Sequence, residues 1–319
     1  MNVRGRLAAA LLCSVSIAMI ASASASAQLQ VGIGDEGASL FANPYFQQLG
    51  VKRTRLITPY NVAVVSPTAD DAWLIGAAIA HQQILVAFNP AAGSKCPGSP
   101  CNAPSASQFK TAFLAFHKRY PFVKAFQPWN EINSLTQPTH ARPDLVVAYY
   151  AIVKKYCGSG CTVTGGDIED LVKGPGVPSS IDEVNYSKAL LKAYKKAHVP
   201  TPQIWGLHNY VDVNYHKSSG TKNALATLPG QIWLTETGGL AEFTLSSGKV
   251  RLPFSLSRQA NATTWMMKLA LSNKRIARVY EYDFFYAPMN RFDSSLLADG
   301  GAPRAAYYVL LHHYAKYFK

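Results

Sequence analysis

The feature that most constrains this chain is a regular alternation between short strand-like runs and amphipathic helical stretches. The runs are rich in β-branched and aromatic residues, and one unit repeats every ~36 residues. Because a helix that follows a strand returns the chain to the same edge of the sheet, the strands of such units run parallel. Eight runs fit the pattern: Gln30–Gly34, Thr54–Thr58, Ile84–Phe88, Val123–Pro128, Thr162–Gly165, Gln203–Leu207, Gln231–Thr235 and Ile276–Tyr282.

The stretches between these runs carry helical signals. Thr68 and Asp71 fit a capping box that opens a helix running towards His81. Two stretches repeat apolar residues at i, i+4, i+7 and i+11, which predicts one buried face on each helix: Phe109, Phe113, Phe116 and Tyr120 in the first, and Leu145, Tyr149, Ile152 and Tyr156 in the second. Helices are also expected over Asn185–His198, Arg258–Asn273 and Pro303–Tyr317.

Eight strand–helix units predict a single α/β domain, a closed (β/α)8 barrel over residues 28–319, near the ~250 residues usual for that fold. The rival is an open doubly wound sheet. Gly32, Gly34 and Gly37 do fit the dinucleotide fingerprint after the first run. However, Asp35 and Glu36 would repel a pyrophosphate, and no acidic residue lies where a ribose would be bound. We therefore expect the barrel, and no cofactor.

The first 27 residues have the pattern of a cleavable export signal. Two early arginines precede the apolar stretch Leu7–Ile20, and an A-x-A site ends at Ala27. A lipid anchor at Cys13 is a weaker alternative, because no good small-residue lead-in precedes it. No apolar run of 18 or more residues follows the signal. The sequence predicts a secreted or periplasmic protein that does not span a membrane.

Four cysteines remain after the signal and form two close pairs in stretches rich in Gly, Ser and Pro: Cys96 with Cys101, and Cys157 with Cys161. Proximity favours one disulfide within each pair, although four cysteines allow three connectivities. A four-cysteine zinc site is the alternative. Export favours disulfides, because oxidising compartments keep cysteines paired.

The chain carries 31 Lys and Arg against 18 Asp and Glu, a formal charge of +13. Such an excess suggests a nucleic acid or an acidic polymer as a partner. The basic residues are scattered along the sequence, and the densest runs, Lys52–Arg55 and Lys195-Lys196, are short. We expect a solvated basic surface, a monomer and no nucleic-acid partner, with an acidic polysaccharide substrate as the alternative. Charged residues are only 15% and hydrophobic residues 48%, which excludes wholesale disorder.

Two glutamates follow predicted strands at corresponding points. Trp129-Asn130-Glu131 ends the fourth run, and Leu234-Thr235-Glu236 ends the seventh. The active sites of (β/α)8 barrels lie at the carboxyl ends of the strands, so these carboxylates would meet across one cleft. Glycoside hydrolysis needs such a pair, one to protonate the leaving oxygen and one to attack the anomeric carbon or activate water.

These segments resemble glycoside hydrolase clan A, the retaining (β/α)8 enzymes with an acid/base after strand four and a nucleophile after strand seven. The resemblance implies that Glu131 is the acid/base and Glu236 the nucleophile. It also implies substrate-binding or supporting roles for Asn130 beside the sugar 2-hydroxyl, for His208 and Tyr210 of a His-x-Tyr motif, and for Arg55 after the second strand.

The chain departs from the clan pattern in ways that leave the subfamily unidentified. Ile132 follows Glu131, where many members have proline, and the third strand ends at Asn89, where the clan often has histidine. A tryptophan that often follows strand eight is replaced by an aromatic run, of which Tyr282 is the residue expected to contact sugar. Trp129 and Trp233 are expected to pack inside the protein.

Other acidic residues near strand ends have weaker predictions. Asp35 and Glu36 could reach a distal sugar. We expect Asp167, Glu169 and Asp170 to lie on a solvated loop at the rim, with binding of substrate hydroxyls or a surface ion as the alternative. The histidines show neither an H-x-H after the first run nor an H-E-x-x-H motif, so no catalytic metal is expected.

The sequence therefore predicts a secreted retaining glycosidase acting on a polysaccharide or oligosaccharide, and the resemblance implies a β-linked one. A non-catalytic glycan-binding barrel and a wall-associated protein that binds acidic polymers are the alternatives.

Overall fold

The structure is a computed structural model that describes residues 28–171, 177–245, 247–287 and 292–319. The predicted export signal lies outside the described residues. No helix in the described ranges is both long and apolar enough to cross a membrane.

The strands form one curled parallel sheet in the order β5-β4-β3-β2-β1-β11-β8-β7-β6. Its two ends, β5 (Thr162–Val163) and β6 (Asp167–Glu169), are consecutive in the chain. Thr164 N donates to Phe126 O on one side, and Gly165 N donates to Ile204 O on the other. Since this segment bonds to both neighbours, the sheet closes, and β5 and β6 together make one of eight barrel strands.

The barrel prediction is therefore confirmed, and the remaining strands lie close to the predicted runs. They are β1 (Gln30–Gly34), β2 (Arg53–Pro59), β3 (Gln83–Asn89), β4 (Ala125–Gln127), β7 (Ile204–His208), β8 (Gln231–Thr237) and β11 (Ile276–Tyr282). Successive strands pair in parallel register around the ring, and β1 pairs with β11.

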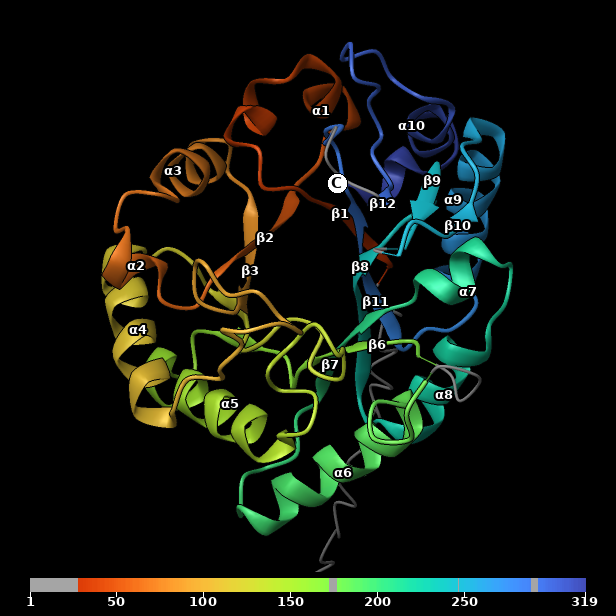
Figure 1. Ribbon diagram of the computed structural model, residues 1–319. Helices are drawn as coiled ribbons and strands as arrows, with labels where there is room; N and C mark the ends of the chain where they lie inside the picture. Colours follow the sequence, from red (N-terminus) through yellow and green to blue (C-terminus); the bar gives the residue numbers. More distant parts are fainter. Residues whose placement is uncertain (1–27, 172–176, 246, 288–291) are drawn as a thin grey trace, which may run out of the picture.

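Helices surround the strands, as the view of Figure 1 shows. They are α1 (Pro44–Leu49), α2 (Val62–Val65), α3 (Asp71–Ile79), α4 (Ala106–Arg119), α5 (Pro143–Cys157), α6 (Glu183–Lys196), α7 (Tyr210–Asn214), α8 (Ser219–Thr227), α9 (Leu256–Leu271) and α10 (Ala305–Val309). The last expected helix, over Pro303–Tyr317, is α10 followed by a π-helical turn and a 3-10 turn.

The two predicted apolar stripes differ in outcome. On α4, Phe109, Phe113 and Phe116 are all buried, as expected, and Tyr120 caps that face. On α5 the buried face is rotated relative to the prediction. Of its predicted stripe only Tyr149 is fully buried, and the rest of the face consists of Val146, Val147, Tyr150 and Val153.

The Thr68 capping box is wrong. The helix α3 starts at Asp71 with Asp70 as its N-cap residue, and no side chain caps it. The Asp70 carboxylate instead accepts a hydrogen bond of 2.7 Å from the Thr58 hydroxyl, which ties the helix start to the end of β2.

The fifth barrel strand continues beyond its predicted end at Gly165. Gly166, with a φ of 140°, turns the chain between the two halves of the strand. The strand then resumes with Asp167. Its carboxylate oxygen Oδ1 lies 1.5 Å from the position that a Cβ would occupy on Gly206 of β7, so this carboxylate fills the space that the glycine leaves. The sequence pattern ends at Gly165 because two glycines interrupt the β-branched run.

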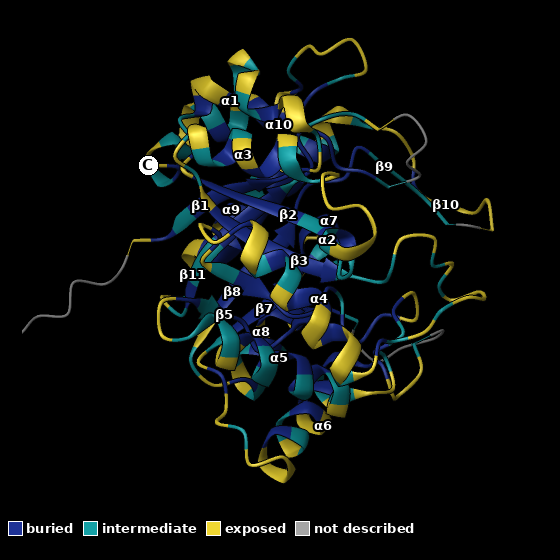
Figure 2. Ribbon diagram, turned by 90° about the vertical axis from the view of Figure 1, so that its left-hand side faces the viewer, coloured by how far each residue is buried: buried dark blue, intermediate teal, exposed yellow. Residues whose placement is uncertain are grey.

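The carboxyl ends of the strands carry the long connections. A small antiparallel sheet, β10 (Val250–Leu252), β9 (Glu242–Thr244) and β12 (Phe292–Asp293), lies there. In Figure 2, β9 and β10 project on the right of the barrel, and the C-terminus lies at the opposite end.

Both predicted disulfides are present. Cys96 bonds Cys101 with a Cα–Cα distance of 4.8 Å, and Cys157 bonds Cys161 with a Cα–Cα distance of 5.8 Å. All four cysteines are thereby used, which sets aside the zinc reading. Two disulfides indicate an oxidising environment.

Candidate active site

Arg55 of β2 organises the carboxyl end of the barrel. Its side chain is fully buried and donates to groups from three other strands or strand ends. Nε donates to Gln127 Oε1 at 2.6 Å, Nη2 to Asn130 Oδ1 at 2.6 Å, and Nη1 to Glu236 Oε2 at 2.8 Å. A buried guanidinium needs such partners, because an unpaired charge in the interior is costly.

Glu236 lies near the end of β8 and is held from both sides. Besides Arg55, the Tyr210 hydroxyl donates to its Oε1 at 3.2 Å. Only 7% of the residue is exposed. A charged donor and a hydroxyl donor on its two oxygens are the contacts that suit a carboxylate anion.

Glu131 follows β4 and is held in an uncommon backbone conformation. Its φ is 46°, a region that non-glycine residues rarely adopt and that clusters at functional sites. The Glu131 side chain is 20% exposed, and its Oε1 lies 3.2 Å from His208 Nδ1. It is therefore more open to the cavity than Glu236.

His208 at the end of β7 lies between three carboxylates. Its Nδ1 is 3.2 Å from Glu131 and 3.8 Å from Glu236, and its Nε2 is 3.5 Å from Asp167 Oδ2. Burial alone would lower the pKa of His208, but the negative charges and hydrogen bonds of these carboxylates raise the pKa to about 10. The imidazole is thus a cation at neutral pH.

Asp167 is the acidic partner on the floor of the site. It is fully buried, 3.3 Å from Arg55 Nη2, and accepts a 2.6 Å hydrogen bond from the Thr235 hydroxyl. Burial would raise the pKa of Asp167, but His208, Arg55 and the Thr235 hydroxyl together lower it. Asp167 therefore remains ionised at neutral pH.

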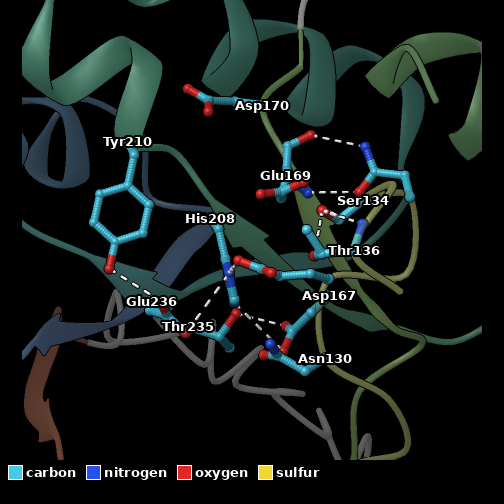
Figure 3. Close-up of polar contacts among 12 residues, drawn as sticks. Asn130, Ser134, Thr136, Asp167, Glu169, Asp170, His208, Tyr210, Thr235 and Glu236 are labelled. Carbon is cyan, nitrogen blue, oxygen red and sulfur yellow. Dashed lines mark hydrogen bonds and ion pairs between the residues drawn. The ribbon is translucent and has the colours of Figure 1, made fainter. Parts of the chain in front are cut away.

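The two glutamates open onto one cavity. One oxygen of Glu131, one of Glu236 and one ring nitrogen of His208 all lie within 4.8 Å of one another. The cavity has a volume of about 430 Å³ and is also lined by Tyr210 and Tyr282. Figure 3 shows the polar side chains converging around His208 from different strands. A volume of this size suits a small organic group such as one or two sugar units.

The remaining predicted contact residues lie in or beside this cavity. Asn130 is 4% exposed, and its Oδ1 accepts a hydrogen bond from Arg55. The amide hydrogens of Asn130 are therefore left to donate to another acceptor. Tyr282 lines the cavity, and its hydroxyl donates to Glu36 Oε2 at 3.3 Å. The structure thus brings together Arg55, Asn130, Glu131, His208, Tyr210, Glu236 and Tyr282.

Several predictions about acidic residues near the rim are wrong. Asp167 and Asp170 are buried and not part of a solvated loop. The Asp170 carboxylate accepts from the backbone N–H groups of Val211 and Asp212, and therefore fixes the start of α7. Glu169 is partly buried in the cavity wall, where burial and the nearby Glu131 raise its pKa well above the ordinary value.

Asp35 does not reach towards a sugar either. It is 4% exposed, and its carboxylate accepts from the backbone N–H groups of Gly37, Phe284 and Phe285, which joins the loops after β1 and β11. Glu36 is exposed beside Tyr282, as a residue near a distal sugar would be.

The tryptophans pack, as expected. Trp129 is fully buried and donates to Gln137 Oε1 at 3.0 Å. Trp233 is 2% exposed, and the Arg278 guanidinium lies 4.0 Å from its ring centroid.

Glu131, His208 and Glu236 also satisfy the distances of a three-ligand metal site. The electrostatics oppose that use. A metal ligand must be a neutral imidazole, whereas the pKa of His208 is raised to about 10. The Arg55 guanidinium, 2.8 Å from Glu236, would also repel a cation.

Sequence reasoning missed Gln127 and Thr235 as parts of this network, and it misjudged Asp167. Gln127 and Thr235 occupy strand positions two or fewer residues from recognised motif residues. Alternation does not mark Thr235, because it is adjacent to Glu236 and neighbouring side chains on a strand point to opposite faces. Asp167 could have been found by continuing the fifth run across its two glycines.

No protein-family model and no curated protein sequence matches this chain. Similar solved structures exist. Xylanase 10B from Thermotoga petrophila RKU-1, in complex with xylobiose, aligns over 91% of this chain and 95% of its own, with 13% identity and a TM-score of 0.60. A GH128 endo-beta-1,3-glucanase from Sorangium cellulosum aligns over 89% and 98%, with 12% identity and a TM-score of 0.58.

A second GH128 endo-beta-1,3-glucanase, from Amycolatopsis mediterranei in complex with laminaritriose, aligns over 89% of this chain and 99% of its own. Its identity is 11% and its TM-score 0.58. Identities this low show a shared fold. The predicted resemblance to glycosidase barrels is thereby confirmed at the level of the fold.

Proposed function

We propose that residues 28–319 form a retaining glycoside hydrolase that cleaves β-linked polysaccharides or oligosaccharides. The observation that carries this proposal is the close approach of Glu131 and Glu236, with one oxygen of each within 4.8 Å, at the wall of one cavity. Retaining enzymes hold their two carboxyl groups ~5–5.5 Å apart, whereas inverting enzymes need ~6.5–9.5 Å to admit a water molecule. The short separation favours retention.

In the first step Glu236 attacks the anomeric carbon while Glu131 gives its proton to the glycosidic oxygen. The contacts of Glu236 with Arg55 and Tyr210 hold one carboxylate geometry for attack. Glu131, the more exposed of the two, reaches the leaving group. In the second step Glu131 takes a proton from a water molecule whose oxygen attacks the anomeric carbon, which breaks the bond to Glu236 and releases the sugar with retained configuration.

The charges beneath the cavity support this division of roles. Arg55 and His208 are cations, and Asp167 and Glu236 are the anions paired with them. Each buried charge of this cluster therefore has a partner, whereas Glu131 lies at its edge and opens onto the cavity, where it can exchange a proton with the substrate or with water.

Two further residues would bind sugar. Asn130, held by Arg55, presents its amide hydrogens beside Glu236 and can donate to the hydroxyl next to the anomeric carbon. Tyr282 presents a ring at the cavity wall. The solved structures with bound xylobiose and laminaritriose are β-glycan enzymes, which makes xylans and β-glucans the first substrates to try.

The site of action follows from the two disulfides together with the export pattern of residues 1–27. We expect cleavage after Ala27 and release into the periplasm or the medium as a monomer. The test is N-terminal sequencing of the protein recovered outside the cytoplasm.

The activity is tested by incubating the protein with a panel of neutral and acidic plant, fungal and bacterial polysaccharides and reading the products by mass spectrometry. Wild type should release oligosaccharides, and Glu236→Ala should lose at least about 99% of that activity because the attacking group is gone. Retention is read from the anomeric configuration of the first product by NMR. Residual activity of several per cent in Glu236→Ala would remove the nucleophile assignment.

Glu131→Ala separates the acid role from a structural one. An activated aryl glycoside has a leaving group that needs little protonation, so its cleavage should suffer less than that of a polysaccharide. Equal losses on both would contradict the acid role. If folded wild type binds a glycan of the panel but releases no product, the chain is a glycan-binding barrel and the proposed activity is wrong.

A further inference from the structure

The basic residues are scattered in the sequence but gathered in the fold. The relevant segments are the last turns of α1, α3, α4, α5, α6, α8 and α9, each with its connection to the following strand, together with residues 310–319. They lie at the amino end of the barrel, opposite the cavity, and are all described. All 18 Asp and Glu lie elsewhere. These segments hold thirteen Lys and Arg: Lys52, Lys118, Arg119, Lys124, Lys154, Lys155, Lys195, Lys196, Lys268, Lys274, Arg275, Lys316 and Lys319.

Most of these cations are free in solvent. Arg119 pairs with Asp71, and Arg275 donates to the carbonyls of Gly230, Leu225 and Leu228. The eleven lysines are all exposed, and none forms an ion pair with a carboxylate among the described residues. We call this surface the amino-end face.

Helix dipoles account for only part of this arrangement. Cations in a last helical turn stabilise the negative end of the helix dipole, which explains Lys154, Lys155, Lys195 and Lys196. Lys52, Lys124 and Lys274 lie in connections outside helices, and helix dipoles do not account for the lack of acidic residues in those connections. A large field of one sign attracts a polyanion.

The amino-end face also contains a hollow. It has a volume of about 320 Å³ and is lined by Phe122, Lys124, Arg278, Gln82, Gln83 and Thr162, among others. Phe122 is 41% exposed and offers an aromatic surface. Arg278 stacks over Trp233 and donates to the Tyr280 hydroxyl, and no carboxylate of the described residues pairs with it. Gln82 Oε1 is buried, and no donor within the described ranges bonds to it.

This combination matches one acidic sugar. A sugar ring can pack against Phe122, its carboxylate can pair with Lys124 and Arg278, and its hydroxyls can reach amide and hydroxyl groups. Single-stranded nucleic acid uses successive aromatic platforms for its bases, whereas Phe122 is the one exposed large aromatic residue in these segments.

We infer that the amino-end face docks onto an anionic, carboxylate-bearing polysaccharide, one acidic sugar of which occupies the hollow beside Phe122. Docking there leaves the cavity at the other end of the barrel free to act on a second chain. The surface is independent of the proposed activity and goes beyond it.

The test measures affinity for polygalacturonate and for its methyl ester, which has the same backbone without charge. Glu236→Ala is the background, so that no chain is cleaved. Lys124→Glu, Lys154→Glu and Lys195→Glu together should weaken polygalacturonate binding by at least about tenfold and flatten its salt dependence. The control combines Lys217→Glu, Lys222→Glu and Lys249→Glu, which change the charge equally on exposed positions outside the amino-end face, and should lose less than about threefold.

Phe122→Ser tests the hollow separately. It should weaken polygalacturonate binding severalfold without changing the salt dependence, because it removes packing and no charge. Neither the face variants nor Phe122→Ser, in an otherwise wild-type chain, should alter turnover of a neutral substrate. These binding results do not depend on catalysis, so they should be the same even if the wild-type protein cleaves no glycan.

Other results would overturn the inference. Equal losses in the two triple variants would mean binding by overall charge, and unchanged binding in both would place the polymer in the cavity. Equal affinity for the methyl ester would remove the role of carboxylates. Tighter binding of a DNA fragment, insensitive to Phe122→Ser, would make the partner a nucleic acid.

Discussion

The two ends of the barrel use charge in opposite ways. At the carboxyl end, Arg55 and Asp167 are fully buried and paired, and His208 and Glu236 complete the cluster. At the amino end, lysines such as Lys154 and Lys195 are exposed and form no ion pair among the described residues. Charged side chains therefore form a buried, paired network at the carboxyl end and an exposed, solvated surface at the amino end.

This difference shows why the net charge of the chain does not predict how much a charged residue at either end contributes to stability. Paired buried charges cancel in the formal total but each depends on its partner, because breaking a buried pair leaves an uncompensated charge. Exposed lysines dominate the total of +13, yet each is screened by water and salt. Substitutions should consequently have large effects at the carboxyl end and small effects at the amino end.

The largest effect on stability should come from Arg55→Leu. It removes the partner of both Asp167 and Glu236 in the interior, and breaking a buried pair typically costs ~3–5 kcal/mol. Urea unfolding followed by circular dichroism measures this loss. Turnover should also fall steeply, since Asn130 and Glu236 lose their anchor.

Arg119→Leu is the matched control, because it breaks an arginine–aspartate pair that is exposed. The Arg119 and Asp71 side chains are 37% and 27% exposed. Its unfolding midpoint should stay near that of wild type, since exposed pairs are screened. Similar losses in the two variants would mean that burial does not distinguish the pairs.

The fold was largely predictable because the strand and helix periods of the chain agree with its topology. All eight runs became barrel strands, and Phe109, Phe113 and Phe116 formed a buried helix face. Residues at strand ends could be placed too, because parallel strands bring their carboxyl ends together. This is how Glu131 and Glu236 are predicted to be neighbours, whereas the resemblance to the glycosidase clan implies the places of Arg55 and His208.

The predictions that were wrong concern residues whose burial depends on contacts between distant parts of the chain, which a periodic sequence pattern does not show. The burial of Asp167 requires the turn at Gly166 and the space left by Gly206 on another strand. Asp35 is buried because its carboxylate accepts hydrogen bonds from the backbone N–H groups of Phe284 and Phe285, about 250 residues further along the chain. The amino-end face likewise exists only after folding, because its lysines lie in separate connections.

Next in size should be an alkaline loss of stability that His208 causes. The pKa of His208 in the fold, about 10, lies above the ordinary histidine value of 6.5, so its contribution to stability is full below pH ~6.5 and is lost as the pH rises towards 10. His208→Asn should therefore be less stable than wild type by a few kcal/mol at pH 6 and by much less at pH 10. Other buried carboxyls also titrate, so the difference between the two proteins is the quantity to measure. A constant difference across this range would contradict a cationic His208.

Glu183, at the start of α6, should also make the protein less stable as the pH rises, but here the substitution should stabilise the fold. Burial, with Asp170 and Asp212 nearby, raises the pKa of Glu183 from 4.5 to about 9. Stability is therefore lost as the pH rises from 4.5 towards 9, because the carboxyl ionises in the unfolded chain and stays protonated in the fold. Glu183→Gln should match wild type at pH 4 and become more stable than wild type by about 1–3 kcal/mol at pH 8. Chemical denaturation at both pH values measures this. A variant that is less stable at both would show that the carboxyl is needed for packing.

The smallest effects should come from the amino-end face. Lys154→Ala and Lys195→Ala should each change the unfolding free energy by less than about 0.5 kcal/mol, since both side chains are exposed and neither forms an ion pair within the part of the chain that the structure describes. Removing several like charges could even stabilise the fold at low salt, because their mutual repulsion falls. Unfolding at low and high salt tests this directly. A loss as large as that of Arg55→Leu would mean that these lysines hold the fold together, and the contrast between the two ends would disappear.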